Sequence, residues 1–170
     1  MHVMVATDGK VDVEKAAAIA ARLASDGGRV TVLTVVEVPR QMLDDMRSAA
    51  ASTAEETARE LDPEYRRSQA DDQPPTRWVG DDAVVARYVK RCVADRTGDL
   101  VAELKATGVD PVVVGEEGEN AARSVLEAAK RLEVDILCIG THGLGRFEGL
   151  LGSLSTKVAR LAPCSVVLIR

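Results

Sequence analysis

Aromatic residues and positive charge are both scarce in this chain. Only 2% of its 170 residues are aromatic, and the net charge is −5 with a pI near 5.1. Proteins that bind single-stranded nucleic acid commonly stack its bases on aromatic rings. Nonspecific binding to nucleic acid or to an anionic membrane requires a basic field. We therefore expect neither nucleic acid nor a membrane as a partner, and a core of Val, Leu, Ile and Ala, as in buried parallel strands.

Cysteine is sparse as well. Cys92, Cys138 and Cys164 are odd in number and far apart, a pattern that favours neither a disulfide framework nor a metal site. Two of them lie in apolar runs, so we interpret them as small core residues. No apolar stretch reaches the roughly 20 residues that a membrane span needs. The opening MHVMVATDGK lacks the basic leader and apolar run of a signal peptide, so we expect a cytoplasmic protein.

The first forty residues predict a strand, a helix and a second strand. VMVAT (3–7) is a short β-type run that Asp8-Gly9 ends. Residues 12–24 are rich in Ala at helical spacing, with Asp12 as the expected N-cap. The next strand, RVTVLTVVEVP (29–39), ends at a proline. Such a βαβ unit has parallel strands and a right-handed crossover.

The middle of the chain is less regular. Residues 40–62 read as a helix with a thin apolar stripe, and residues 62–82, with three prolines, as a polar surface excursion. A second helical pattern runs from about Asp82 to Thr107, and we expect it to break near Thr97-Gly98. Its expected buried face consists of Val84, Val85, Tyr88, Val89, Val93, Leu100, Val101 and Leu104.

Regular alternation resumes in the last third. VDPVVVGE (109–116) predicts a strand, residues 120–132 a helix capped by Asn120, and VDILCIG (134–140) a strand buried on both faces. A glycine-rich loop then leads into a helix that reaches about Leu161, and SVVLIR (165–170) predicts a final strand. This order indicates an α/β domain whose parallel sheet carries helices on both faces.

The glycine-rich loop is the best candidate for a binding site. Five glycines crowd the exit of a buried strand: Gly140, Gly143, Gly145, Gly149 and Gly152. Backbone amides in such a loop can form an anion nest, which the positive end of the following helix reinforces. The residues leave two alternatives open, a phosphate-binding loop or glycines that merely permit a tight turn. Neither a P-loop motif nor a dinucleotide fingerprint is present.

Ligands of open α/β sheets bind beyond the carboxyl ends of the strands, where the strand order reverses. Asp8 leaves the first strand at the same edge as the glycine-rich loop, which makes it a candidate for ribose hydroxyls or a metal. Ser153 and Ser155 could donate hydrogen bonds to phosphate or cap the helix. No second ligand lies at useful spacing from His142, so we expect no metal site there.

Three segments resemble the universal stress protein family: VMVATDGK, VTVLTVVEVP and DILCIGTHGLGRFEGLLGSLSTKVARLAPCSVVLIR. The resemblance implies one domain over residues 1–170, with a divergent helical and polar excursion at about 40–106. It implies a doubly wound, five-stranded parallel sheet in the order 3-2-1-4-5, with helices on both faces. It also implies a homodimer joined through residues 165–170.

Many members of that family bind ATP with the pattern G-x-x-G-x9-G-[ST]. Here Gly140 and Gly143 open the pattern and Gly152-Ser153 close it, but eight residues rather than nine lie between Gly143 and Gly152. The missing residue either tightens the loop or rotates the start of the helix by about 100°. Gly145 and Gly149 favour adjustment within the loop.

The resemblance implies an adenine-nucleotide site with ATP as the ligand, with or without Mg²⁺. The residues that it implies for this site are Ala6, Thr7, Asp8, Val35, Ile139, Gly140, Gly143, Gly152, Ser153, Leu154 and Ser155. By similarity, the first three contact adenine and ribose, the backbone of the fourth reads the adenine edge, and the next two line the base and ribose. Gly143 and the four residues at the start of the helix hold the phosphates.

Two basic residues and one histidine near this site have alternative interpretations. Lys10 could reach phosphate or stay in solvent, Arg146 could approach a γ-phosphate or point outward, and His142 could bind a phosphate oxygen or pack against the turn. We assign no catalytic residue. The first hypothesis is a cytosolic, dimeric, ATP-binding regulator of the stress response. Its alternatives are a slow ATPase, and a family member that binds no nucleotide and acts only as an interaction protein.

Overall fold

The computed structural model describes residues 1–25, 27–38, 79–141 and 152–170. The predicted helix at 40–62, most of the predicted excursion at 62–82, and the loop residues from His142 to Leu151 lie outside these ranges. The chain divides into two compact units. Met1–Glu37 and Val89–Arg170 form the first unit, which holds the sheet, and Val38–Tyr88 form the second. The contacts discussed below all belong to the first unit.

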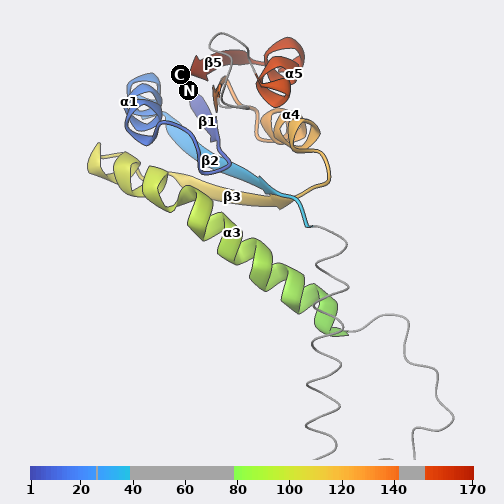
Figure 1. Ribbon diagram of the computed structural model, residues 1–170. Coiled ribbons are helices and arrows are strands. Elements are labelled where there is room, and N and C mark those ends of the chain that lie inside the picture. The colour runs from blue at the N-terminus through green and yellow to red at the C-terminus, as the bar shows by residue number, and fades with distance from the viewer. Residues whose placement is uncertain (26, 39–78, 142–151) are drawn as a thin grey trace, which may run out of the picture. The chain divides into compact units, whose positions relative to one another are not determined.

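A five-stranded parallel sheet in the order β3-β2-β1-β4-β5 forms the centre of the first unit (Figure 1). Its strands are β1 (His2–Ala6), β2 (Arg29–Val36), β3 (Val112–Glu117), β4 (Ile136–Gly140) and β5 (Ser165–Ile169). This order confirms the predicted fold class. The direction of strand addition reverses at β1, whose neighbours are β2 and β4.

Four helices are described. They are α1 (Val13–Leu23), α3 (Val79–Ala106), α4 (Ala121–Arg131) and α5 (Ser153–Leu161). The predicted N-caps of α1 and α4 are confirmed, because the Asp12 and Asn120 side chains accept backbone N–H groups of the first helical turns. Within the described residues, no helix is both long and apolar enough to cross a membrane.

The predicted break near Thr97-Gly98 is wrong, because α3 runs unbroken through both residues. A glycine inside a helix costs about 1 kcal/mol relative to alanine. The next turns offset this cost, since Leu100 and Leu104 are fully buried in the core. The hydroxyl of Thr97, itself buried, donates to the Val93 carbonyl within the helix. Tertiary burial thus outweighs the local preference for a stop.

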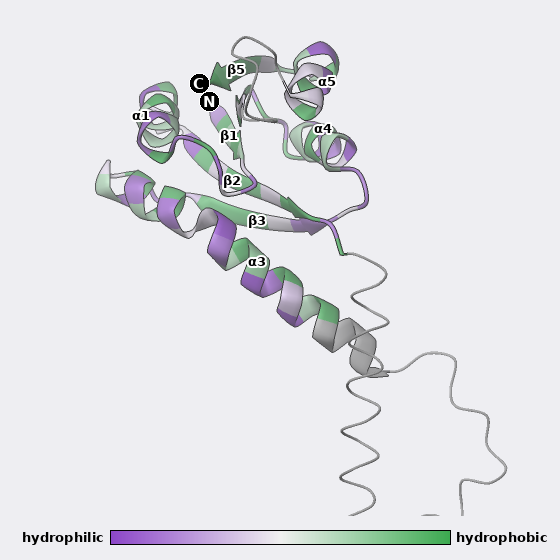
Figure 2. Ribbon diagram, viewed as in Figure 1, coloured by the Kyte–Doolittle hydropathy of each residue, from purple (hydrophilic) through white to green (hydrophobic). Residues whose placement is uncertain are grey.

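The helices cover both faces of the sheet and create two apolar cores (Figure 1). Ala17 and Ala20 of α1 and Leu100 of α3 pack on one face of the strands. On the other face, Val125 of α4 and Val158 of α5 belong to the second core. Figure 2 shows the consequence, with largely hydrophobic strands and helices whose sides differ in hydropathy. Small alanine side chains let α1 and α4 lie close to the sheet.

Hydrogen bonds close the N-terminal ends of the strands. His2 is buried; its Nδ1 lies 2.9 Å from the Leu132 carbonyl oxygen and its Nε2 2.8 Å from the Thr31 hydroxyl. The His2 backbone N–H donates to the Asp135 carboxylate, and the Arg29 guanidinium also donates to the Leu132 carbonyl. These polar groups at the N-terminal end of the sheet are therefore bonded within the protein.

Candidate functional site

A cavity of about 160 Å³ lies at the opposite, C-terminal end of β1, β2 and β4. The residues that line it are Ala6, Thr7, Asp8, Lys10, Val11, Leu33, Val35, Ala121, Val125, Ile139, Gly140, Gly152, Leu154 and Ser155. The cavity is therefore at the point where strand order reverses, the usual ligand position in an open α/β sheet.

Apolar side chains form much of the cavity wall. Leu33 and Val125 are buried in the core, and Ile139 is 4% exposed. Polar groups come mainly from two segments, the turn after β1 and the start of α5. A mainly apolar wall with a few convergent polar groups suits a ligand that has a flat apolar part and a charged part.

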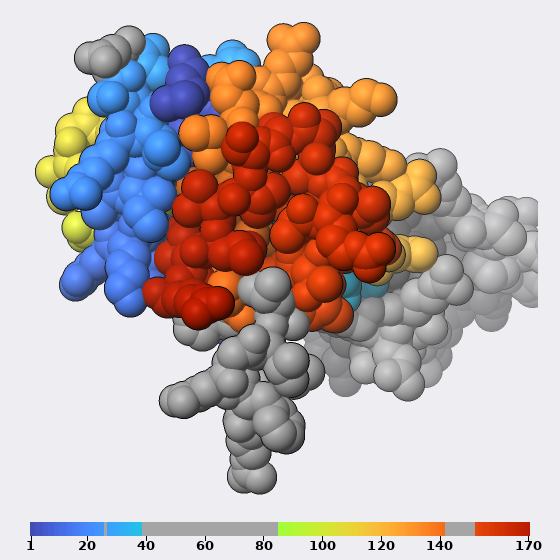
Figure 3. Space-filling model, turned by 90° about the horizontal axis from the view of Figure 1, so that it is seen from above, coloured from blue at the N-terminus to red at the C-terminus, as the bar shows by residue number. Residues whose placement is uncertain are grey.

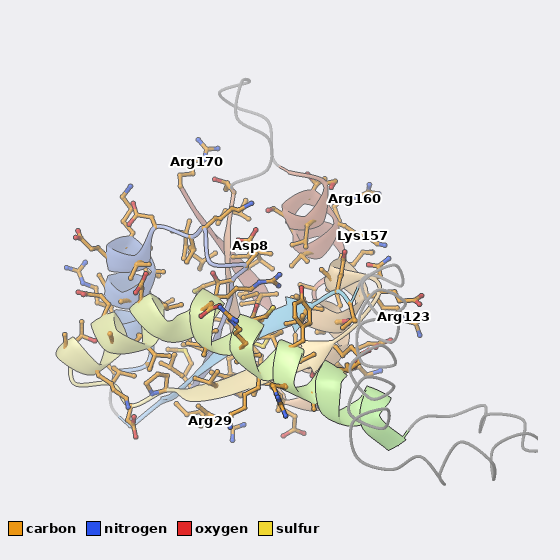
Figure 4. The ribbon with its side chains drawn as sticks, turned by 60° about the horizontal axis from the view of Figure 1, so that its bottom comes forward. Asp8, Arg29, Arg123, Lys157, Arg160 and Arg170 are labelled. Atoms are coloured by element: carbon orange, nitrogen blue, oxygen red, sulfur yellow. The ribbon has the colours of Figure 1, made fainter. Side chains whose placement is uncertain are left out.

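Local hydrogen bonds shape the turn after β1. The Thr7 hydroxyl accepts the Gly9 N–H at 2.9 Å, and the Asp8 carboxylate accepts the Lys10 N–H at 3.1 Å through Oδ1. Gly9 has φ +91°, a left-handed conformation that favours glycine. Asp8 is exposed and is labelled in Figure 4 in the loop between β1 and α1. Its second carboxylate oxygen could therefore accept a ligand hydroxyl.

The start of α5 presents backbone N–H groups to the cavity. Its N-cap is Gly152, which has no side chain to accept those groups. The first N–H groups of a helix lack partners within the helix, and together they carry a partial positive charge. Gly152 and Leu154 line the cavity. An anionic group of a ligand would find hydrogen-bond donors there.

Ser155 has a structural role at this helix start. The Ser155 hydroxyl donates to the Gly140 carbonyl at 2.8 Å, and the residue is only 3% exposed. This bond joins α5 to the end of β4. The predicted donation from Ser155 to phosphate would compete with it, so backbone N–H groups are the better phosphate donors in this geometry.

The cavity brings together nine of the eleven residues predicted for the site. Ser153 is exposed in the first turn of α5 and is absent from the described lining. Gly143 lies outside the described residues, as do His142 and Arg146. Lys10, for which two interpretations were open, is exposed and also lines the cavity.

The apolar wall residues Val11, Leu33, Ala121 and Val125 are not among those predicted for the site. Their hydrophobic periodicity predicts burial, but it does not distinguish a core position from a cavity wall. No group of three or more His, Cys, Asp or Glu side chains within residues 1–25, 27–38, 79–141 and 152–170 could hold a metal ion.

The sequence profile of the universal stress protein family matches residues 1–170. The chain belongs to that family. This universal stress protein is 46% identical over 50 residues to a universal stress protein of Thermus aquaticus, a match that covers 29% of this chain and 36% of the relative. It is 36% identical over 45 residues to universal stress protein A homolog 1 of Coxiella burnetii, covering 26% and 31%. The matches thus span about a third of each curated relative.

Solved structures share the fold of this universal stress protein over nearly the whole chain. A universal stress protein in complex with cAMP has a TM-score of 0.56 at 20% identity, covering 100% of this chain and 97% of that one. The Archaeoglobus fulgidus protein in complex with dAMP has a TM-score of 0.51 at 16% identity, covering 100% and 98%. An Arabidopsis thaliana family protein with AMP bound has a TM-score of 0.52 at 15% identity, covering 99% and 90%.

Proposed function

We propose that this universal stress protein binds adenine nucleotides, ATP in particular, and acts as a dimeric regulator of the stress response in the cytoplasm. The bare N-cap of α5 at an apolar cavity carries the proposal. Leu33, Val35 and Ile139 offer an apolar surface to the base, and the helix start offers N–H donors to the phosphates. Asp8 is available to ribose hydroxyls. In this proposal, Mg²⁺ reaches the cavity only as the ion that is bound to ATP.

Relatives with cAMP, dAMP and AMP support the coarser part of this proposal, adenine-nucleotide binding. The preference for a triphosphate rests on the glycine-rich segment that precedes Gly152 and on the helix start itself. A triphosphate places more negative charge at the positive end of α5 than a monophosphate does.

A binding role is favoured over an enzymatic one. Asp8 is the sole carboxylate among the described lining residues, and one of its oxygens accepts the Lys10 N–H. Hydrolysis would need a general base or a metal-ordered water beside the γ-phosphate. A ribose contact would occupy the Asp8 carboxylate, which would then be unavailable as the base. Slow hydrolysis is therefore kept as the first alternative. A role in protein binding without nucleotide is the second.

Equilibrium dialysis of the purified protein with labelled ATP, with CTP as the matched pyrimidine control, tests the proposal. We expect saturable ATP binding and weaker CTP binding, and some ATP or AMP in the protein as purified. Equal binding of both nucleotides, or none of either, contradicts it. Product analysis over several hours distinguishes binding from hydrolysis.

The proposed dimer interface is β5, which lies at one edge of the sheet. Figure 3 shows β5 and α5 together on the visible surface. Val166, Val167 and Leu168 are only partly buried within the described chain. An apolar edge strand of this kind favours pairing with a second copy around a two-fold axis.

The strand register identifies the residue whose replacement tests the dimer. The Ser165 N–H donates to Asp135, and the Ile169 carbonyl accepts from Thr141, so the odd-numbered residues of β5 face β4. The N–H of Val166 therefore points to the open edge, whereas that of Val167 belongs to the β4 ladder. Val166→Pro should give a folded monomer by sedimentation, and Val166→Ala a dimer. A dimeric Val166→Pro protein, or a wild-type monomer at micromolar concentration, contradicts the proposal.

A further inference from the structure

The Val35 carbonyl of β2 lies beyond the last residue of β1 that could donate a hydrogen bond to it. The Leu33 carbonyl accepts the Thr7 N–H at 2.9 Å, so it faces β1. Successive residues of a strand direct their backbone groups to opposite neighbours, and the Val36 carbonyl accordingly accepts from Gly118 on the other side. The Val35 carbonyl must therefore face the side of β1. That strand ends at Ala6, so β1 supplies no donor at this level.

Arg96 of α3 supplies the missing donor. Its Nη1 donates to the Val35 carbonyl at 2.9 Å, and the side chain is partly buried. The Arg96 side chain also passes beside the turn after β1, because a Cβ at Gly9 would lie 3.6 Å from Arg96 Cβ and Cγ. Among the residues that the structure describes, no carboxylate forms an ion pair with Arg96.

The position of this bond makes it relevant to the ligand. Val35 lines the cavity beside the apolar residues proposed to hold the base. A free backbone N–H and C=O at Val35 would match the edge of a 6-aminopurine, which offers an acceptor ring nitrogen and a donor amino group. Arg96 already donates one hydrogen bond to that carbonyl, so a 6-amino group would have to share the oxygen with a charged donor. A guanidinium is also a good donor to the 6-oxo group of a purine.

We propose that Arg96 sets the base selectivity of the cavity. It competes with a 6-amino group for the Val35 carbonyl and offers N–H donors to a 6-oxo group. The cavity therefore accepts 6-oxopurine nucleotides as well as adenine nucleotides. This inference rests on the proposed nucleotide site, and it assigns Arg96 a specificity role that no local sequence pattern indicates.

ATP and ITP are the matched probes, because they differ only in the 6-substituent and the adjacent ring nitrogen. The quantity to measure is the ratio of the ITP dissociation constant to the ATP dissociation constant, by equilibrium dialysis. We expect a ratio within about threefold of unity for the wild-type protein, since the charged Arg96 donor to the 6-oxo group offsets the loss of the ring-nitrogen acceptor, which carries a hydrogen in ITP. A wild-type protein that binds ITP more than about tenfold more weakly than ATP contradicts the inference, without any variant.

Variants at position 96 test whether Arg96 sets the ratio of the two dissociation constants. Arg96→Ala frees the Val35 carbonyl for the 6-amino group and removes the donor to the 6-oxo group, so the ratio should rise by about tenfold. Arg96→Lys retains a donor and should keep the ratio near the wild-type value. Arg91→Ala is the control on the same helix, because the Arg91 side chain is 83% exposed and pairs only weakly with Asp95 at 3.8 Å.

The outcomes separate this inference from the proposed function. A merely structural role of Arg96 would weaken ATP and ITP binding equally and leave the ratio unchanged, which overturns the inference. If the wild-type protein binds ATP and the ratio is the same in all variants, only the role of Arg96 is wrong. If the wild-type protein binds neither nucleotide, the proposed function is wrong together with the inference.

Discussion

The two ends of the parallel strands differ in how their polar groups are used. At the N-terminal end, His2 forms hydrogen bonds with Thr31, Leu132 and Asp135. At the C-terminal end, the Gly152 N-cap lacks a side-chain bond and a cavity opens between the strands and α5. Both ends belong to the same strands, so sheet geometry alone does not create a site. The two ends differ in whether side chains of the protein form hydrogen bonds with the free backbone groups or leave these groups available to a ligand.

The largest expected effect is a loss of ATP binding at the C-terminal end of the strands, where the cavity lies. Gly152→Val places a β-branched side chain where phosphate must approach the start of α5, and ATP binding should weaken at least about a hundredfold. Gly152 has φ −58°, which valine can adopt, so the protein should still fold. Isothermal calorimetry and thermal unfolding measure the two effects.

A second glycine provides the control for that experiment. Gly98 is exposed on α3, and a Cβ there would meet nothing within 4 Å. Gly98→Val should leave ATP affinity unchanged. Undiminished ATP binding by Gly152→Val would show that the helix start is not the phosphate site.

At the N-terminal end of the strands, a substitution should lower the stability of the protein without changing its affinity for ATP. His2→Ala removes both ring hydrogen bonds and leaves the buried Thr31 hydroxyl without this partner. Leaving a buried polar group unsatisfied costs about 1–3 kcal/mol, so the free energy of unfolding should fall by that amount. Urea denaturation measures the loss, and ATP affinity should stay within about twofold. A matching loss of ATP affinity would show that the two ends are coupled.

An effect that appears only at high pH, and is absent near neutral pH, is expected between the two ends, at Cys138. Burial raises the pKa of this thiol from 9.0 to about 11. The unfolded chain thus ionises first, and the stability that the protonated thiol contributes is complete below about pH 9 and is lost as the pH rises toward 11. The loss should approach about 1.4 kcal/mol per pH unit in that window.

Denaturation of wild-type protein and Cys138→Ala across that pH range isolates this contribution, because the other titrating groups are shared. The wild-type protein should lose more stability than the variant. Equal slopes would mean that the thiol is not desolvated in the folded protein, which contradicts this prediction.

Sequence patterns predicted where the strands lie, because most of them are short apolar runs bounded by turn signals, and the family resemblance supplied their order in the sheet. The caps of α1 and α4 were also predictable, since Asp12 and Asn120 act within three residues of themselves. The predicted break in α3 failed for the opposite reason. Gly98 favours a stop locally, but Leu100 and Leu104 bury against strands far away in the sequence.

The candidate site was only partly predictable. Glycines and Asp8 carry recognisable local patterns, and the family resemblance supplied Val35. Arg96 offered no signal, because it is one of several charged residues on α3 and its partner lies 61 positions earlier in the chain. The role of Ser155 was equally hidden, since its acceptor is the Gly140 carbonyl of another element.

The sequence by itself determined the order of strands and helices, the family, and the segment around which a ligand site could form. These properties depend on local periodicity, capping and turn chemistry, which act over a few residues. Only the tertiary structure decided which polar groups remain free. His2 closes one end of the sheet, while Arg96 and Ser155 occupy carbonyls at the other. The physical reason is that hydrogen-bond partners in a parallel sheet come from segments far apart in the chain, so their pairing depends on the packed fold.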